Sequence, residues 1–345
     1  VDGVLQTQTQ ADKRIGGALA QRLKLMAGLD ISEKRLPQDG RFSVRLKDNT
    51  IDVRLSTLPT TYGESAVMRL LNQGAGMRRL DTIGMPADML KRFRDVLSRS
   101  SGMVLVTGPT GSGKTTTLYA ALAEINAAEL KVITVEDPVE YRLPAITQVQ
   151  VNDKIELTFS RVLRACLRQD PDVIMLGEIR DGETAQMAIR AALTGHLVLS
   201  TIHTNSAWGT ISRLIDMGVP PFLLANTINT SVAQRLVRKL CDCKVVEPLN
   251  SQDWIHQHTE FPTPETHHIA FGCDNCHFTG YKGRIALYEV IPIDSVLAQK
   301  IKNNDYSVGD VLAERGIKRL AQRAYELFIN GETSLEEVYP LLTEF

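Results

Sequence analysis

Apolar positions in residues 1–80 change from a helical spacing to an alternation with polar positions. Leu19, Leu23 and Met26 lie three or four residues apart, as on one face of a helix. After a loop at residues 36–40, apolar and polar residues alternate, which indicates strands because successive strand side chains point to opposite faces. The strands expected here are residues 4–5, 42–46, 51–55 and 66–71. We therefore predict a small α/β unit.

Residues 81–240 follow a glycine-containing linker at residues 74–76 and carry a different pattern. Short continuous apolar runs are separated by stretches with helical spacing. Strands buried on both faces have such runs, and their alternation with helices predicts a parallel sheet covered on both sides. The predicted strands are residues 104–107, 132–135, 173–176 and 197–202. Ligands of such sheets bind at the carboxyl ends of the strands, so polar residues there are candidates for function.

The rest of the chain is less regular. Residues 241–285 hold two close cysteine pairs and several histidines, whereas residues 286–345 have mostly helical spacing. Residues 331–337 predict the start of a final, capped helix. Because the chain opens with Val1 rather than Met, close to an expected strand, we expect the natural N-terminus to lie upstream.

Composition and charge narrow the class of protein. A chain of 345 residues is long enough for two or three domains, and 43% apolar with 23% charged residues is ordinary for a globular protein. The net charge of −1 gives no general reason to expect a nucleic-acid partner. No apolar run approaches the roughly 18–20 residues that a membrane-spanning helix needs, and no signal peptide is visible. We therefore expect a cytoplasmic protein.

Residues 108–115, GPTGSGKT, fit the phosphate-loop pattern G-x-x-x-x-G-K-[ST] and directly follow the apolar run 103–106. A strand, a glycine-rich turn and then a helix is the context that this motif requires. Backbone N–H groups of such a loop hold nucleotide phosphates. Lys114 is positioned to reach the β- and γ-phosphates, and the Thr115 hydroxyl to bind Mg²⁺. The predicted ATP-binding residues are Gly108, Pro109, Thr110, Gly111, Ser112, Gly113, Lys114, Thr115 and Thr116.

Acidic residues follow two of the predicted strands. Glu178 comes after residues 173–176, where a carboxylate can hold metal-bound water, because Mg²⁺ prefers carboxylate and water ligands. Glu136, Asp137 and Glu140 come after residues 132–135. Either of the two glutamates is a candidate to orient the attacking water. The alternative for both groups is a solvated strand end or loop.

Two histidines lie at opposite ends of the predicted strand 197–202. His196 precedes the strand, and His203 follows it together with Thr204 and Asn205. Histidines in these places can respond to bound nucleotide through hydrogen bonds. The alternative is a core histidine whose hydrogen bonds are satisfied.

Four arginines are candidates for stabilising the charge that develops on a γ-phosphate. Arg54 and Arg69 lie in the first region, whereas Arg164 and Arg168 precede the strand that leads to Glu178. Spacing alone does not distinguish them from solvated surface charges.

The cysteines form two close pairs and one single residue. Paired cysteines in a cytosolic enzyme point to a metal more than to disulfides. The two pairs are Cys241 with Cys243 and Cys273 with Cys276. A loop-rich insert with little core of its own depends on a metal to stay folded. The alternative is four free thiols, and Cys166 is expected to be a small buried apolar side chain.

With these residues assembled, the chain resembles the ATPases of type II secretion and type IV pilus assembly over nearly its whole length. Four blocks carry the resemblance in order: the phosphate loop 108–115, the aspartate box 134–140, the Walker B segment 172–181 and the histidine box 194–205. Residues 36–40 and 233–238 are also similar to the family. The cysteine pair 273–276 and residues 278–284 resemble the assembly branch, since retraction motors generally lack the cysteine module. The pair Cys241-x-Cys243 departs from the family spacing of two intervening residues. The resemblance implies a closed, tetrahedral, structural zinc site with Cys241, Cys243, Cys273 and Cys276 as ligands and His277 as a substitute.

The resemblance implies an α/β fold with four parts. These are a PAS-like domain at residues 1–80, a RecA-like ATPase domain at 81–240, a tetracysteine zinc module at 241–285 and a C-terminal helical subdomain at 286–345. It implies that Glu140 is the base that activates water, Glu178 the metal-associated acid and His203 part of the catalytic site. Arg54 and Arg69 match arginines that reach the γ-phosphate. Arg164 and Arg168 match a further functional basic pair.

The resemblance further implies a homohexameric ring with nucleotide between the first two domains. Such a ring works in the cytoplasm, docked at the inner membrane through platform and adaptor proteins, and turns ATP hydrolysis into extension of a pilus or pseudopilus. Three alternatives stay open. A retraction motor is disfavoured by the cysteine pairs. A DNA-transfer ATPase is disfavoured by the near-neutral charge and by the lack of an evident stacking platform. A nucleotide-gated scaffold would bind ATP and barely hydrolyse it.

Overall fold

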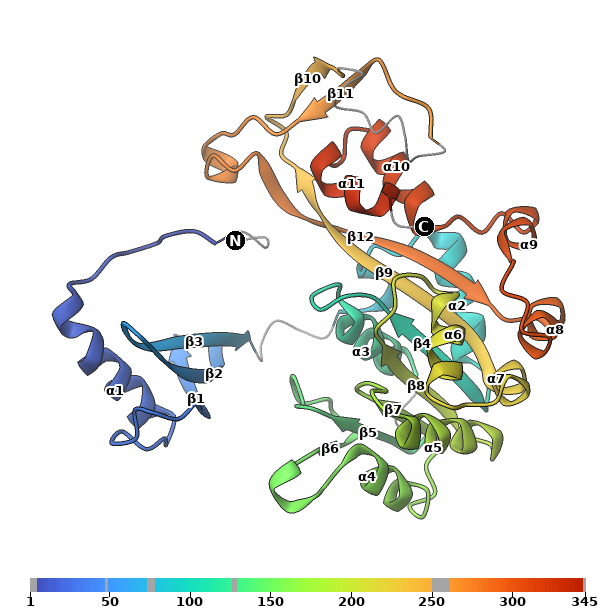
Figure 1. Ribbon diagram of the computed structural model, residues 1–345, viewed down its shortest axis with the longest axis horizontal. Coiled ribbons are helices and arrows are strands. Elements are labelled where there is room, and N and C mark those ends of the chain that lie inside the picture. Colours follow the sequence, from blue (N-terminus) through green and yellow to red (C-terminus); the bar gives the residue numbers. More distant parts are fainter. Residues whose placement is uncertain (1–4, 47–48, 73–77, 126–128, 250–260, 344–345) are drawn as a thin grey trace. The chain divides into compact units, whose positions relative to one another are not determined.

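The computed structural model describes residues 5–46, 49–72, 78–125, 129–249 and 261–343 (Figure 1). Contacts within the chain divide it into two units. The first comprises the described part of residues 3–77 together with Glu140–Leu143. The second comprises the described part of the remaining chain, residues 78–139 and 144–345.

The first unit is a three-stranded antiparallel sheet with one α-helix, as the alternating pattern predicts. The sheet has the order β1-β2-β3, and α1 packs against β1 and β3. Its elements are α1 (Gly16–Met26), β1 (Gln38–Leu46), β2 (Asn49–Thr60) and β3 (Gly63–Asn72), preceded by the short η1 (Lys13–Ile15). Val53 and Leu55 of β2 are buried, while polar residues alternate with them. This alternation gives the central strand β2 one apolar, buried face.

Three expectations for this region need comment. β1 begins at Gln38, inside the loop predicted at residues 36–40, so that prediction is wrong at its second half. Leu5 does not belong to a strand, and Val4 lies outside the described residues. The linker expected at residues 74–76 also lies outside them.

The second unit is built on a seven-stranded sheet of order β12-β9-β4-β8-β7-β5-β6. All neighbouring strands run parallel except β12, which pairs antiparallel with β9. The strands are β4 (Gly102–Thr107), β5 (Val132–Glu136), β6 (Thr147–Gln150), β7 (Val173–Leu176), β8 (Leu197–Ile202), β9 (Ile228–Leu240) and β12 (Tyr281–Pro292). Every residue of β4, β5, β7 and β8 is buried, which explains their continuous apolar runs.

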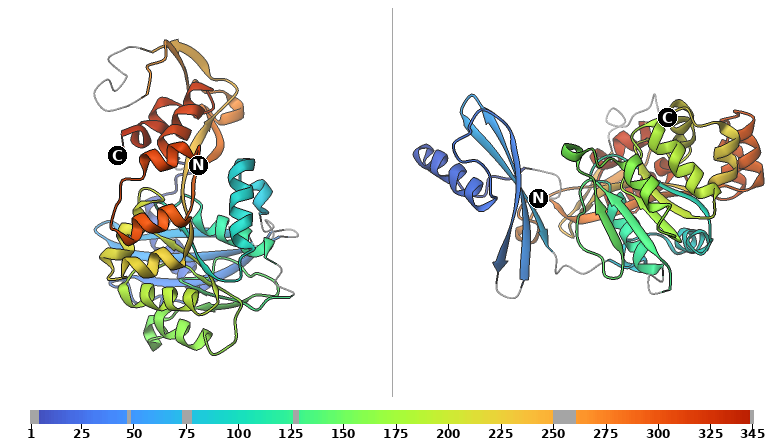
Figure 2. Two further views of the ribbon diagram at one scale, coloured as in Figure 1. Left: turned by 90° about the vertical axis from the view of Figure 1, so that its right-hand side faces the viewer. Right: turned by 90° about the horizontal axis from the view of Figure 1, so that it is seen from below.

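Helices cover both faces of this sheet (Figures 1 and 2). The crossover from β4 to β5 runs one way along the sheet and that from β7 to β8 runs the other way, so right-handed connections put α3 and α5 on opposite faces. α4 and α7 pack against α5. The helices are α2 (Ala87–Leu97), α3 (Lys114–Glu124), α4 (Phe159–Cys166), α5 (Gly182–Leu193), α6 (Gly209–Asp216) and α7 (Pro221–Thr227), with the short helices η2 (Leu80–Thr82) and η3 (Asp153–Ile155).

β9 and β12 continue beyond the other strands as a long antiparallel pair and lead to a small cysteine-containing region (Figure 1). That region contains β10 (Val245–Pro248) paired with β11 (Thr266–Ile269), and the short helix η4 (Asp274–Cys276). The chain ends in four helices, α8 (Ser295–Lys302), α9 (Gly309–Glu314), α10 (Leu320–Ile329) and α11 (Leu335–Thr343). Of the helices described, none is long and apolar enough to span a membrane.

Candidate functional site

The phosphate loop connects the buried strand β4 to the N-terminus of α3. Its three glycines all have positive φ angles, +146° at Gly108, +83° at Gly111 and +90° at Gly113, which side chains rarely adopt. A Cβ atom added to Gly108 would lie 2.3 Å from the carbonyl oxygen of Gln234 on β9. Glycine is therefore required at Gly108 both by the backbone angle and by the close approach of β9.

Two side chains of this loop, Lys114 and Ser112, have surroundings that fit a bound phosphate. Lys114 Nζ donates to the carbonyl oxygens of Gly108 and Pro109, at 2.8 and 3.0 Å, so the lysine lies across the loop. The pKa of Lys114 is lowered from its usual value, mainly because the side chain is partly buried. The carboxylate of Glu178 opposes this shift, and the positive charge of Arg235 adds to it. The Ser112 hydroxyl is buried and has no hydrogen-bond partner among the described residues. A buried hydroxyl without a partner fits a phosphate oxygen, because leaving it unsatisfied costs about 1–3 kcal/mol.

The first turn of α3 supplies the remaining predicted loop residues. Thr115 is exposed and Thr116 half-buried, directly after Lys114. The residues present thus fit a nucleoside triphosphate, with the Thr115 hydroxyl as the predicted Mg²⁺ ligand.

Glu178 and His203 meet at the carboxyl ends of β7 and β8. Glu178 Oε2 lies 3.5 Å from Nε2 of His203. The Glu178 carboxylate also pairs with Arg180, whose Nη1 lies 3.4 Å from Oδ2 of Asp137. Arg180 thus links the Walker B segment to the aspartate box. Sequence reasoning did not single out Arg180, and its only signal was its place two residues after Glu178.

The two candidate bases of the aspartate box differ in their surroundings. Glu136 is 3% exposed and accepts hydrogen bonds from Tyr119, from Thr134 Oγ1 at 2.5 Å and from Gln148 Nε2 at 3.1 Å. Its acceptor capacity is used inside the core. Glu140 is half-buried. Glu140 is therefore the better candidate to orient water, as the resemblance implies.

Arg54 and Arg69 lie directly opposite each other on β2 and β3. Like charges in such a cross-strand pair repel each other and are destabilising. Arg54 Nη1 lies 3.2 Å from Oε2 of Glu140, within the first unit, while Arg69 is exposed. The structure therefore pairs Arg54 with Arg69 across two strands and places Arg54 beside the predicted base Glu140.

The other predicted residues have local structural partners. Arg164 pairs with Glu183 at 2.5 Å, and Arg168 Nη1 donates to the Arg164 carbonyl oxygen at 2.8 Å. His196 Nδ1 lies 2.9 Å from the Ala191 carbonyl oxygen. His196 and His203 lie at opposite ends of β8, which has six residues. At a rise of about 3.3 Å per residue, they are roughly 20 Å apart. His196 therefore fits the alternative of a satisfied histidine at a helix end.

The four paired cysteines form one cluster. Their sulfur atoms all lie within 4.8 Å of one another, and three of the distances are 3.8–3.9 Å. Four sulfurs at about 2.3 Å from a tetrahedral zinc ion would lie about 3.8 Å apart. The Cys-x-Cys spacing thus does not prevent a four-sulfur site, and His277, which is exposed, is not part of the cluster. Cys166 is a buried residue of α4, as expected.

Backbone donors favour the thiolate form of Cys276. The N–H groups of Cys273 and Gly280 lie 3.1 and 3.2 Å from its sulfur. Burial raises the pKa of Cys276, but these backbone hydrogen bonds, together with hydrogen bonds to the side chains of Cys273 and Cys243, outweigh burial and bring the pKa to about 6. Thiolates are the form in which cysteines bind metal.

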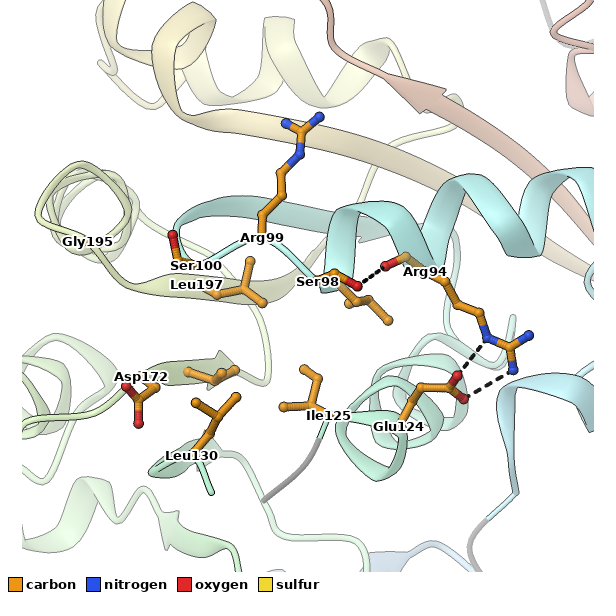
Figure 3. A pocket seen from close by; sticks show the side chains of 12 residues that line it. Arg94, Ser98, Arg99, Ser100, Glu124, Ile125, Leu130, Asp172, Gly195 and Leu197 are labelled. Atoms are coloured by element: carbon orange, nitrogen blue, oxygen red, sulfur yellow. Dashed lines mark hydrogen bonds and ion pairs between the residues drawn. The ribbon is translucent and has the colours of Figure 1, made fainter. Parts of the chain in front are cut away.

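A separate cavity of about 630 Å³ lies at the opposite edge of the sheet, at the amino ends of β7 and β8 (Figure 3). Arg94, Arg99 and Asp172 line it, and Arg94 forms an ion pair with Glu124. Because parallel strands place the phosphate loop at their carboxyl ends, this cavity is distinct from the nucleotide site.

Comparisons with known proteins identify the family of this chain. The family model described as "Type II/IV secretion system protein" matches residues 1–340. Type II secretion system protein E of Klebsiella pneumoniae is 48% identical over 341 residues, which cover 98% of this chain and 68% of the relative. Type II secretion system ATPase E of Vibrio cholerae is 45% identical over 349 residues, covering 100% of this chain and 69% of the relative.

Solved structures show the same fold. The crystal structure of the pilus retraction motor PilT with bound ADP has a TM-score of 0.65 and 28% identity, covering 93% of this chain and 79% of PilT. The Legionella pneumophila ATPase DotB has a TM-score of 0.70 and 21% identity, covering 97% of this chain and 85% of DotB.

A parallel-rich α/β sheet with a phosphate loop after β4 and acids after β5 and β7 defines an ATPase of the phosphate-loop class. The chain belongs to the type II/IV secretion system protein family. As a member of that family, it is a secretion ATPase that hydrolyses ATP.

Proposed function

We propose that this ATPase is a hexameric cytoplasmic motor that hydrolyses Mg²⁺-ATP to drive assembly of a type II secretion pseudopilus or a type IV pilus. The observation that carries the proposal is the phosphate loop, with Lys114 and the buried Ser112 hydroxyl, next to the acids that follow β5 and β7. The names of the relatives in Klebsiella pneumoniae and Vibrio cholerae favour type II secretion.

Each residue of the site has a role in phosphoryl transfer under this proposal. Lys114 and the backbone N–H groups of the loop bind the phosphates, and Thr115 with Glu178 holds Mg²⁺ and its water. Glu140 orients the attacking water. Arg54 and Arg69 stabilise the charge on the γ-phosphate. His203 contacts Glu178 and completes the acidic end of the site.

The domain architecture is part of the proposal. Residues 1–80 form a PAS-like domain, and residues 81–240 a RecA-like ATPase domain. Residues 241–285 bind one structural zinc ion through the four clustered cysteines. Residues 286–345 form a helical subdomain, except that residues 286–292 are the end of strand β12 and not helical as expected. The motor docks at the inner membrane through platform and adaptor proteins and needs no nucleic acid.

The first test is the variant Lys114→Ala. We expect its ATPase rate to fall at least about a hundredfold, because the charge that binds the β- and γ-phosphates is lost. Steady-state phosphate release from the assembled protein measures this. Lys91→Ala, which removes an exposed lysine from α2, is the matched control and should keep the wild-type rate. Equal rates in the two variants would rule out the phosphate loop as the catalytic site.

A retraction motor is the second candidate, because PilT is a retraction motor and shares the fold at 28% identity. The cysteine cluster favours the assembly branch. Deleting the gene distinguishes the two motors. Loss of secretion or of pili supports assembly, whereas an excess of pili supports retraction.

A further inference from the structure

Glu289 of β12 is a buried carboxylate that the proposed chemistry does not use. Its side chain is 4% exposed. One oxygen, Oε1, accepts the backbone N–H of Ala207 at 3.0 Å. The other oxygen, Oε2, accepts the backbone N–H of Leu320 at 3.0 Å. A single side chain therefore connects two segments that are far apart in the sequence.

Burying this carboxylate is costly, and local groups offset the cost. Burial raises the pKa of Glu289, while the N–H groups of Leu320 and Ala207 and the nearby cations Arg319 and Arg235 lower it. A charged group at such a place is usually replaceable by an apolar one when stability alone matters. Its two backbone contacts point to a role in holding those segments together.

The Ala207 contact fixes the end of the histidine box. The Thr204 N–H donates to Oγ1 of Thr107, the residue before the phosphate loop, at 2.8 Å. Arg235 Nη2 donates to the Asn205 carbonyl oxygen at 2.8 Å. Residues 203–207 are thus held by β4, β9 and β12 in turn. His203, at the start of this segment, is the residue that meets Glu178.

The Leu320 contact fixes the start of α10. Leu320 is the first residue of that helix, and an anionic carboxylate at a helix N-terminus is favoured by the helix dipole. α10 packs against α11 and contacts β9, β11 and β12 (Figure 1). Glu337 of α11 in turn binds Arg238 of β9 at 2.8 Å. Glu289 therefore joins the nucleotide site to the C-terminal helices within the second unit.

We propose that Glu289 is a positioning residue that couples the histidine box to α10, so that a shift of residues 203–207 on nucleotide binding reaches the C-terminal helices. The inference rests on the proposed function, since it needs nucleotide at the phosphate loop. It assigns to α10 and α11 the regulation of that site, and by reciprocity a partner that binds these two helices changes the affinity for nucleotide.

Two variants remove the coupling in different ways. Glu289→Gln keeps the shape but replaces one acceptor with a donor that faces a backbone N–H. Leu320→Pro removes the donor on the helix side. Proline is tolerated at the first position of a helix, and Arg319 before it already has the extended backbone that proline requires. Leu320→Ala is the matched control, since it loses the same side chain but keeps the N–H group.

The experiment compares amide hydrogen exchange of α10 with and without ADP and Mg²⁺, in the assembled full chain. We expect ADP to change exchange in α10 in the wild type and in Leu320→Ala. In Glu289→Gln and Leu320→Pro we expect no change, although binding of a fluorescent ADP analogue stays within about twofold of wild type. ATP turnover of Glu289→Gln should fall about five- to tenfold at an unchanged KM.

The remaining outcomes test the coupling and the proposed function separately. An α10 response that is absent in the wild type, or equal in all four proteins, overturns the coupling. Unchanged turnover in Glu289→Gln does the same. Failure of the wild type to bind the ADP analogue would instead contradict the proposed function.

Discussion

Phe278 combines two unfavourable properties at one position. Its backbone has a φ angle of +60°, and its side chain is 73% exposed. The left-handed conformation costs a residue with a side chain roughly 1–2 kcal/mol. The turn nevertheless lets the Phe278 N–H donate to the Cys273 carbonyl oxygen at 2.9 Å and brings the Gly280 N–H to Cys276. The strain therefore accompanies the geometry that gathers the cysteines.

We predict that Phe278→Asn keeps or raises stability, by up to about 1 kcal/mol, because asparagine tolerates the left-handed backbone and little packing is lost. Thermal unfolding together with zinc analysis measures this. Phe271→Asn is the matched control, since Phe271 is 71% exposed and its φ angle is not positive. A loss of stability at Phe278 larger than at Phe271 would contradict the strain argument.

Residue spacing located the phosphate loop but could not choose between Glu136 and Glu140, and the choice of Glu140 came from the family resemblance alone. Both glutamates follow the same strand at similar positions. The difference comes from Tyr119 of α3 and Gln148 of β6, which are distant in the sequence and fill the acceptor sites of Glu136. Only the tertiary structure brings these partners together.

At the scale of elements, β9 shows the limit of pattern reading. The apolar strands β4, β5, β7 and β8 were predicted to within two residues, because they are buried along their whole length. β9, β6 and β12 were not predicted. β9 carries Gln234 and Arg235 in the core, where they bind Thr117 at 2.7 Å and Asn205 at 2.8 Å instead of packing as apolar side chains. Because Gln234 and Arg235 interrupt it, β9 lacks the continuous apolar run that would have identified it as a buried strand.

The cysteine region is a second element-scale test. We expect about one zinc ion per chain in the wild type and none in Cys276→Ser, because a closed structural site needs all four ligands. Loss of the ion should lower the unfolding temperature and open β10 and β11 to proteolysis. Cys166→Ser is the matched control, because Cys166 and Cys276 are both 4% exposed and only the latter is in the cluster. Equal zinc content in the two variants would exclude the site.

At the scale of the whole molecule, the aspartate box is shared between the two units. Residues up to Val139 belong to the second unit, and Glu140–Leu143 to the first. Glu140 is thereby grouped with Arg54, whose Nη1 lies 3.2 Å from its carboxylate. The pattern of the sequence placed this box wholly in the region of residues 81–240, because local spacing does not report long-range contacts.

We predict that Arg54→Ala lowers ATP turnover about tenfold or more while ATP binding stays near wild type, because the arginine acts on developing charge rather than on the bound phosphates. Single-turnover hydrolysis and a fluorescent-nucleotide titration separate the two effects. Arg45→Ala, an exposed arginine of β1, should leave both unchanged. Parallel losses of binding and turnover at Arg54 would argue for a role in the ground state.

β9 also fixes the number of residues between the phosphate-loop contacts and the cysteine cluster. Gln234 and Arg235 touch the phosphate loop, and the same strand ends at Leu240, next to Cys241. Because strand side chains alternate, inserting one residue between these points would turn either the loop contacts or the first cysteine to the wrong face. The distance between Cys241 and Cys243 can vary, as the Cys-x-Cys spacing shows. The length of β9 cannot vary in the same way. Deletions and insertions should therefore be far rarer in β9 than between the paired cysteines.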